Sequence, residues 1–302
     1  MVKTLILKND DLAFTAYHYK NKLDSAPLVL CLHGFPDGPQ TFRHQVNDLL
    51  AAGYQVITAT LRGYESSSIP IDGDYTITAI AGDVLAWIDQ LGVKKTHLIG
   101  HDWGAAVAYA VAASAPDRFY SIATIAIPHP QRFMQKGLAK IPSQALKSWY
   151  MLFNQLPVIS DYFLQRNDFA FIRYLWKKWS PSYHLSSDDW VQLRNSFSQA
   201  GVVEAMLSYY RQNASLGQML GLKNSSSSQN MIINVPNLCI TGSEDGCMDT
   251  RLFEHTILEC DHPKGFKVER IDDAGHFVHL EKPAIVNKLL IDWFKSNELT
   301  GL

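Results

Sequence analysis

The sequence has little net charge, few cysteines and no long apolar run. Its 27 lysine and arginine residues nearly balance 29 aspartate and glutamate residues, and its pI is near 6.6. This balance argues against a nucleic-acid or membrane-surface partner, because both favour strongly basic chains. The four cysteines are irregularly spaced, and Cys31 and Cys239 fall inside apolar, strand-like runs. We therefore expect buried, reduced thiols rather than a disulfide framework or a zinc site.

The start of the chain also lacks a long apolar run, since its first apolar stretch stops at Lys8. Such a stretch is too short for a signal peptide or a membrane span, so we expect a cytoplasmic protein. At 302 residues, with 47% hydrophobic and 19% charged residues, the composition is that of a globular protein with a large core. This length fits two domains, or one α/β domain that carries an insertion.

Strand-like and helix-like segments alternate through the first 127 residues. The patterns predict strands at 3–8, 12–20, 28–32, 54–60, 96–99 and 120–127, and helices at 41–52, 76–91 and 105–115. The alternation resumes near the end of the chain, with strands at 236–241 and 266–271 and helices at 250–259 and 283–296. Such alternation is typical of a parallel sheet with right-handed crossovers, so the predicted fold class is α/β.

The alternation stops at Pro128-His129-Pro130, and residues 129–230 are mostly helical in period. This segment contains 16 of the 34 aromatic residues of the chain, and a serine-rich stretch at 224–228 closes it. The simplest interpretation is an α/β core formed by residues 1–128 and 231–302, interrupted by one helical insertion. The many aromatic residues predict an apolar pocket between the insertion and the core.

The sequence Gly100-His101-Asp102-Trp103-Gly104 joins a predicted strand to a predicted helix. Its pattern, G-x-D-x-G, is that of a nucleophile elbow with an aspartate where serine usually lies. The two glycines allow a sharp turn that places the central residue in the open, in a strained conformation. The motif alone is weak evidence, because most aspartates in such stretches are turn or helix N-cap residues.

An elbow of this kind predicts partners in the order nucleophile, acid, histidine. Glu244 and Asp245 both follow a late strand, and either could be the acid. His276 follows the last strand in a glycine-preceded turn, whereas we expect His279 to be structural. Ligands and catalytic groups gather at the carboxyl ends of parallel strands, so this order indicates a catalytic set that includes Asp102 and His276.

The turn His33-Gly34-Phe35-Pro36 follows the third predicted strand. This loop is where the architecture places one of two oxyanion donors, and the other is the backbone N–H of the residue after the nucleophile. We therefore expect Phe35 and Trp103 to act through their amides. His33 is expected to form structural hydrogen bonds.

These motifs resemble those of the α/β-hydrolase epoxide hydrolases, and the resemblance covers nearly the whole chain. It rests on the segments 33–36, 100–104, 242–245 and 273–276. It implies an α/β-hydrolase fold with a mostly parallel, eight-stranded sheet, flanking helices and an inserted helical cap. It also implies Asp245 as the acid and a cis bond before Pro36. The related haloalkane and haloacid dehalogenases share the aspartate elbow, so these motifs leave the reaction open.

The resemblance further implies two cap tyrosines that face the nucleophile. The early one matches Tyr150, within 149–157, and the late one matches Tyr210, with Tyr209 as the alternative. A phenol is still protonated at neutral pH and can protonate an opening epoxide, whereas a departing halide needs no proton. The tyrosines therefore favour an epoxide substrate.

The resulting hypothesis is a cofactor-independent and metal-independent hydrolase that opens a small apolar epoxide to a vicinal diol. Asp102, ionised at pH 7, would form an alkyl ester, and water activated by His276 and Asp245 would hydrolyse it. A dehalogenase is the alternative, because Trp103 could contact a halide. A catalytically silent ligand-binding relative is a third interpretation, which the complete catalytic set disfavours. The sequence leaves open whether the protein is a monomer or a homodimer.

Overall fold

The computed structural model describes residues 2–23, 25–137, 140–214 and 231–298. Eight strands form one sheet in the order β1-β2-β4-β3-β5-β6-β7-β8. Strands β1 and β2 pair antiparallel, as do β2 and β4, and all other neighbours run parallel. The strands are β1 (Val2–Asn9), β2 (Leu12–Tyr19), β3 (Leu28–Leu32), β4 (Gln55–Ala59), β5 (Thr96–His101), β6 (Phe119–Ile125), β7 (Asn237–Gly242) and β8 (Phe266–Ile271). The predicted eight-stranded, mostly parallel sheet is therefore confirmed.

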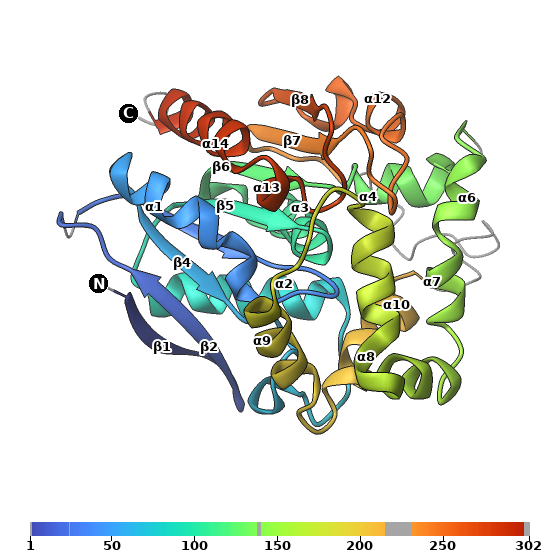
Figure 1. Cartoon of the computed structure of the whole chain (residues 1–302). Coiled ribbons are helices and arrows are strands. Elements are labelled where there is room, and N and C mark those ends of the chain that lie inside the picture. The colour runs from blue at the N-terminus through green and yellow to red at the C-terminus, as the bar shows by residue number, and fades with distance from the viewer. Residues whose placement is uncertain (1, 24, 138–139, 215–230, 299–302) are drawn as a thin grey trace.

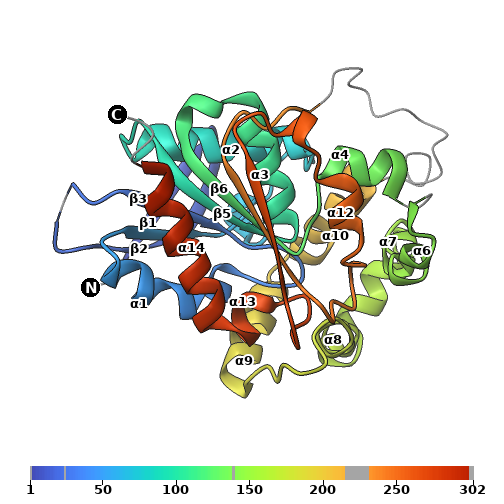
Figure 2. The same ribbon diagram turned by 90° about the horizontal axis from the view of Figure 1, so that it is seen from above.

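Helices cover both faces of the sheet (Figures 1 and 2). One face carries α1 (Arg43–Ala51) and α14 (Pro283–Glu298), and the other carries α2 (Ile77–Gln90) and α3 (Trp103–Ser114). Because both faces are covered, a central strand such as β3 is apolar and buried at every position. Each face has its own hydrophobic cluster, and the larger one continues into the helices that follow β6.

The helices between β6 and β7 lie beyond the end of the sheet toward which the arrows of β5 and β7 point (Figure 1). They are α4 (Pro130–Arg132), the π-helical turn η4 (Phe133–Gly137), α6 (Ser143–Lys147), α7 (Trp149–Phe153), α8 (Ile159–Trp179), α9 (Ser187–Phe197) and α10 (Val202–Asn213). Helix α8 is interrupted by non-helical backbone at Arg166–Phe169. The serine-rich stretch at 224–228 lies outside the described residues.

The helix predicted at 250–259 is shorter than expected. Helix α12 spans only Leu252–Thr256, and a 3-10 turn, η5 (Glu259–Asp261), follows it. The backbone of Ile257 is extended, and it follows another β-branched residue, Thr256. Such residues are stiff in helices, which explains the early end. The remaining short elements are η1 (Pro39–Phe42), η2 (Ser66–Ser68), η3 (Pro116–Arg118) and α13 (Val278–Glu281). Among the described residues, no helix is long and apolar enough to cross a membrane.

Candidate active site

Asp102 occupies the sharp turn between β5 and α3. Its backbone has φ 51° and ψ −120°, a conformation that L-residues rarely adopt. The glycines on both sides are required for steric reasons, because a Cβ at Gly100 would collide with the carbonyl of Gly104, and one at Gly104 would collide with the carbonyl of Leu32. The predicted elbow geometry is therefore present at this position.

The imidazole of His276 lies between two carboxylates. Its Nδ1 is 2.9 Å from Oδ2 of Asp245, and its Nε2 is 3.5 Å from Oδ2 of Asp102. All three side chains are buried, whereas Glu244, the other candidate acid, is exposed. Asp245 is held by two backbone N–H groups that donate to its Oδ1, from Cys247 at 2.7 Å and from the next residue at 2.8 Å. The structure thus brings Asp102, His276 and Asp245 together.

This arrangement favours an ion pair between Asp102 and His276. Burial raises the pKa of Asp102, but the hydrogen bond and charge of His276 and the N–H of Phe35 outweigh it, so the pKa lies below its usual value. Burial lowers the pKa of His276, but the carboxylates of Asp245 and Asp102 outweigh it and hold that pKa well above its usual value. These two opposite pKa shifts favour an ionised carboxylate next to an imidazolium around neutral pH.

The turn after β3 contacts the other oxygen of the Asp102 carboxylate. The N–H of Phe35 donates to Oδ1 of Asp102 at 2.8 Å, and the Phe35–Pro36 peptide bond is cis, as the resemblance implied. Trp103 begins α3 directly after Asp102. His33 points into the core, where its Nε2 accepts from the N–H of Leu61 at 3.0 Å. Burial lowers the pKa of His33 to about 4, so its ring is neutral.

The two predicted tyrosines meet beside this carboxylate. Tyr150 comes from α7 and Tyr210 from α10, and the centroids of their rings are 5.7 Å apart. Burial, together with the charge of Asp102, raises the pKa of both hydroxyls well above the usual value, so both are protonated. The hydroxyl of Tyr150 lies 3.2 Å from Sγ of Cys247. The hydroxyl of Tyr209, the alternative, instead donates to the carbonyl of Arg62 at 2.7 Å.

Several polar atoms around Asp102 have no hydrogen-bond partner in the described part of the chain. They are the hydroxyl of Tyr210 and the indole nitrogens of Trp103 and Trp179, and all of them are buried. The ring of Tyr210 packs edge-on against that of Trp103, with 5.1 Å between the centroids. The candidate site is therefore rich in unsatisfied hydrogen-bond donors, which suits a ligand that carries an acceptor oxygen or a leaving anion.

Two residues of this site were missing from the predicted set, Trp179 and Cys247. Trp179 ends α8, and its ring centroid lies 5.1 Å from that of His276 and 4.8 Å from that of Tyr150. Its carbonyl accepts the N–H of His276 at 3.0 Å. Cys247 follows Asp245 by two residues and is fully buried. No sequence pattern separates Trp179 from the other aromatic residues of its segment, because its position depends on how that segment packs on the sheet.

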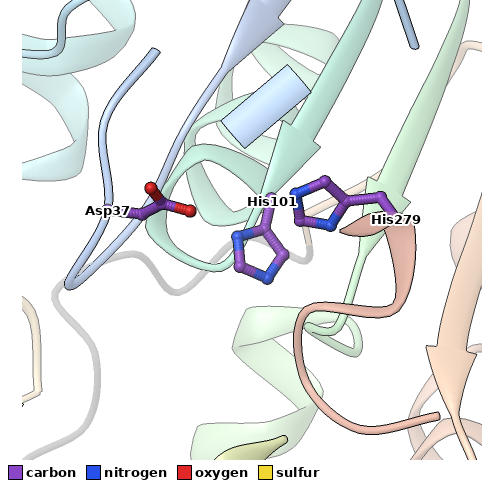
Figure 3. A group of neighbouring side chains, drawn as sticks. All are labelled: Asp37, His101 and His279. Carbon is purple, nitrogen blue, oxygen red and sulfur yellow. The ribbon is translucent and has the colours of Figure 1, made fainter. Parts of the chain in front are cut away.

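A second buried polar group adjoins the site (Figure 3), formed by Asp37, His101 and His279, which come from separate parts of the chain. One potential metal-ligating atom of each lies within 4.8 Å of the others. Nε2 of His101 contacts the carbonyl of His276 at 3.1 Å, and Nε2 of His279 contacts the hydroxyl of Thr41 at 2.7 Å. Burial raises the pKa of Asp37 to about 7 and lowers that of His101 to about 3. Burial also holds the pKa of His279 well below its usual value, so both imidazoles are neutral. Two neutral imidazoles and the carboxyl group of Asp37, once ionised, are ligands that divalent transition metals accept.

Comparison with known proteins gives consistent results. The family model described as alpha/beta hydrolase fold matches residues 27–283. The AB hydrolase superfamily protein YfhM of Bacillus subtilis is 33% identical over 276 residues, which cover 90% of this chain and 92% of that protein. Human epoxide hydrolase 4 is 30% identical, over 89% of this chain and 72% of that protein.

A solved structure supports the same assignment. A mutant of an epoxide hydrolase from Bacillus megaterium, complexed with its product (R)-3-[1]naphthyloxy-propane-1,2-diol, superimposes with a TM-score of 0.83. It is 26% identical, and the match covers 96% of this chain and all of that one. The chain therefore belongs to the α/β-hydrolase fold family and, within it, to the epoxide hydrolases.

Proposed function

We propose that this protein hydrolyses apolar epoxides to vicinal diols through a covalent ester on Asp102. The observation that carries the proposal is the juxtaposition of an ionised carboxylate, an imidazole held by Asp245, and two protonated phenols around one buried point. The names of its relatives support the reaction class. The product bound to the Bacillus megaterium enzyme favours aryl ether epoxides as the first substrates to test.

In the first step Oδ2 of Asp102 attacks a ring carbon of the epoxide. The other oxygen, Oδ1, accepts the N–H of Phe35 and becomes the carbonyl oxygen of the new ester. The C–O bond of the strained ring breaks, and its oxygen takes a proton from one of the two phenols, Tyr150 or Tyr210, which leaves a tyrosinate. A carboxylate needs no general base for this attack, because it is ionised at neutral pH.

Ester formation changes the charge balance around His276. Asp102 loses its negative charge, so one of the groups that raise the pKa of His276 disappears. His276 can then return its proton to the tyrosinate and become a neutral base. Asp245 remains hydrogen-bonded to Nδ1 and keeps Nε2 directed at the ester.

In the second step His276 takes a proton from water, and the hydroxide adds to the ester carbonyl of Asp102. The oxyanion develops on Oδ1, next to the N–H group of Phe35, and we propose the N–H group of Trp103 as the second donor. Collapse expels the diol oxygen, which takes the proton from His276. The carboxylic acid left on Asp102 then transfers its proton to His276, which restores the starting ion pair.

We also propose that residues 129–230 act as a cap on the α/β core formed by 1–128 and 231–302. Tyr150 and Tyr210 belong to this segment, while Asp102 belongs to the core. Direct contacts join the two parts, including an ion pair of 2.9 Å between Arg43 and Asp189. In the closed arrangement Asp102 is only 4% exposed, so water is largely excluded from the reacting atoms.

The proposal is tested by turnover of an aryl glycidyl ether to its diol, with chromatographic detection of the product. The double variant Tyr150→Phe/Tyr210→Phe is expected to lose turnover, since neither phenol remains to protonate the opening ring. Tyr209→Phe is the matched control, because Tyr209 is equally buried but its hydroxyl donates a hydrogen bond to the backbone carbonyl of Arg62. Absence of diol with a varied panel of aryl and aliphatic epoxides would contradict the proposal.

A dehalogenase remains the second candidate function. Trp103 and Trp179 each present a buried indole N–H without a partner among the described residues, and such donors suit a departing halide. Release of halide from haloalkanes or haloacids, without turnover of epoxides, would support this candidate. Binding of apolar ligands without any turnover would instead favour a silent ligand-binding relative.

A further inference from the structure

Cys247 lies between the acid and one of the two tyrosines. Its N–H donates to Oδ1 of Asp245 at 2.7 Å, and its carbonyl accepts the side-chain amide of Gln144 at 3.0 Å. Its Sγ is 3.2 Å from the hydroxyl oxygen of Tyr150. The backbone of Cys247 is therefore fixed from both sides, and its thiol is held against a proposed proton donor.

The thiol also approaches the catalytic base. One atom each of Asp245, Cys247 and His276 lies within 4.8 Å of the others, and all three side chains are fully buried. Burial raises the pKa of Cys247, so the group is a neutral thiol around pH 7. A neutral thiol has one S–H to donate and a sulfur that accepts weakly. It is suited to hydrogen bonding rather than to nucleophilic attack.

The hydroxyls of Tyr150 and Tyr210 differ in their hydrogen-bond partners. The Tyr150 hydroxyl has the thiol as its partner, whereas the Tyr210 hydroxyl lies beside the indole of Trp103 and has no partner in good hydrogen-bond geometry among the described residues. An epoxide oxygen is a better acceptor than sulfur, so in the complex the Tyr150 proton turns to the substrate. The S–H of Cys247 can then donate a hydrogen bond to the hydroxyl oxygen of Tyr150. After proton transfer, the same S–H stabilises the tyrosinate.

We propose that Cys247 is a positioning residue that makes Tyr150, rather than Tyr210, the proton donor in ring opening. This inference rests on the proposed epoxide hydrolysis. It requires that Cys247 act on ring opening through Tyr150, so the effect of removing the thiol on kcat/KM must depend on whether the phenol is present. A purely structural role of Cys247 would give the same effect in either background.

The test measures kcat/KM for an aryl glycidyl ether in two backgrounds, Tyr210→Phe and Tyr150→Phe. In Tyr210→Phe, where Tyr150 is the remaining donor, Cys247→Ala is expected to lower kcat/KM by about five- to tenfold, the effect of one lost hydrogen bond. In Tyr150→Phe the same substitution is expected to change kcat/KM by less than about twofold. Cys247→Ser, which keeps a hydrogen-bond donor, should recover most of the loss in the first background.

Cys239→Ala is the matched control. Cys239 is also a fully buried thiol beside a phenol, since its Sγ lies 3.5 Å from the hydroxyl of Tyr109, but it belongs to β7 and contacts none of the proposed catalytic groups. It should leave kcat/KM unchanged in both backgrounds. Thermal unfolding of each variant separates a loss of folded protein from a loss of catalysis.

Three results would overturn the inference. They are an equal loss from Cys247→Ala in both backgrounds, no loss in either, or a substrate adduct on Cys247 in peptide mapping. Failure of the proposed function itself is distinguishable, because the unsubstituted protein would then form no diol.

Discussion

Replacement of His276 by glutamine should separate the two chemical steps. Alkylation of Asp102 needs a carboxylate and a proton donor, and neither is His276. Hydrolysis of the ester needs a base for water, and the Nε2 atom of His276, 3.5 Å from the Asp102 carboxylate, is the group placed to act as that base. His276→Gln is therefore expected to react with one molecule of epoxide and then stop.

The substitution His276→Gln slows the two steps by different factors, because each step loses a different interaction. General-base assistance contributes about 10²- to 10⁴-fold, so ester hydrolysis should slow by that factor. Alkylation loses only the hydrogen bond and charge that lower the pKa of Asp102. Burial then raises this pKa, so alkylation should slow mainly at acid pH. Above neutral pH, nearly every protein molecule should accumulate as the ester.

Intact-protein mass spectrometry measures this directly. After the variant is mixed with a reactive aryl epoxide, its mass should increase by the mass of one substrate, and peptide mapping should place the addition on Asp102. Asp102→Asn/His276→Gln is the control and should remain unmodified. An unchanged mass of His276→Gln, with folded protein and a reactive epoxide, would refute the two-step mechanism.

Three further predictions follow from the same geometry. Asp245→Asn should lower kcat by at least about a hundredfold because the imidazole loses its anionic partner, whereas exposed Glu244→Gln should leave kcat unchanged in steady-state assays. Gly104→Ala should destabilise the fold by about 1–3 kcal/mol and lower Tm, since its Cβ would collide with the carbonyl of Leu32; an unchanged Tm would contradict this. The folded-state pKa of His276 is raised, so its stabilising contribution is complete below about pH 6.5 and is lost as pH rises through the folded pKa. The Tm advantage of the wild type over His276→Gln should therefore shrink as pH increases, and a gap that widens would count against the ion pair.

Most of the fold could be predicted because its signals are local. The run at 28–32 is apolar at every position since β3 is covered on both faces, and the elbow glycines are dictated by close backbone contacts. The helix predicted at 250–259 is too long. Its helical pattern of apolar residues continues through Thr256 and Ile257, and the stiffness of these two residues, which ends the helix, does not alter that pattern.

The candidate site was harder to predict where neighbouring residues compete or distant segments meet. Glu244 and Asp245 are adjacent in sequence, and the structure distinguishes them by two N–H groups that hold only Asp245. Trp179 and Cys247 reach the site through packing between segments far apart in the chain. A sequence read segment by segment has no signal for such contacts.

In the proposed mechanism Asp102, and not water, attacks the epoxide. A single turnover in H₂¹⁸O, with enzyme in excess over substrate, tests it most directly. We expect a diol without ¹⁸O and one ¹⁸O in the carboxylate of Asp102, since water adds to the ester carbonyl. A diol that contains ¹⁸O, with an unlabelled Asp102, would contradict it.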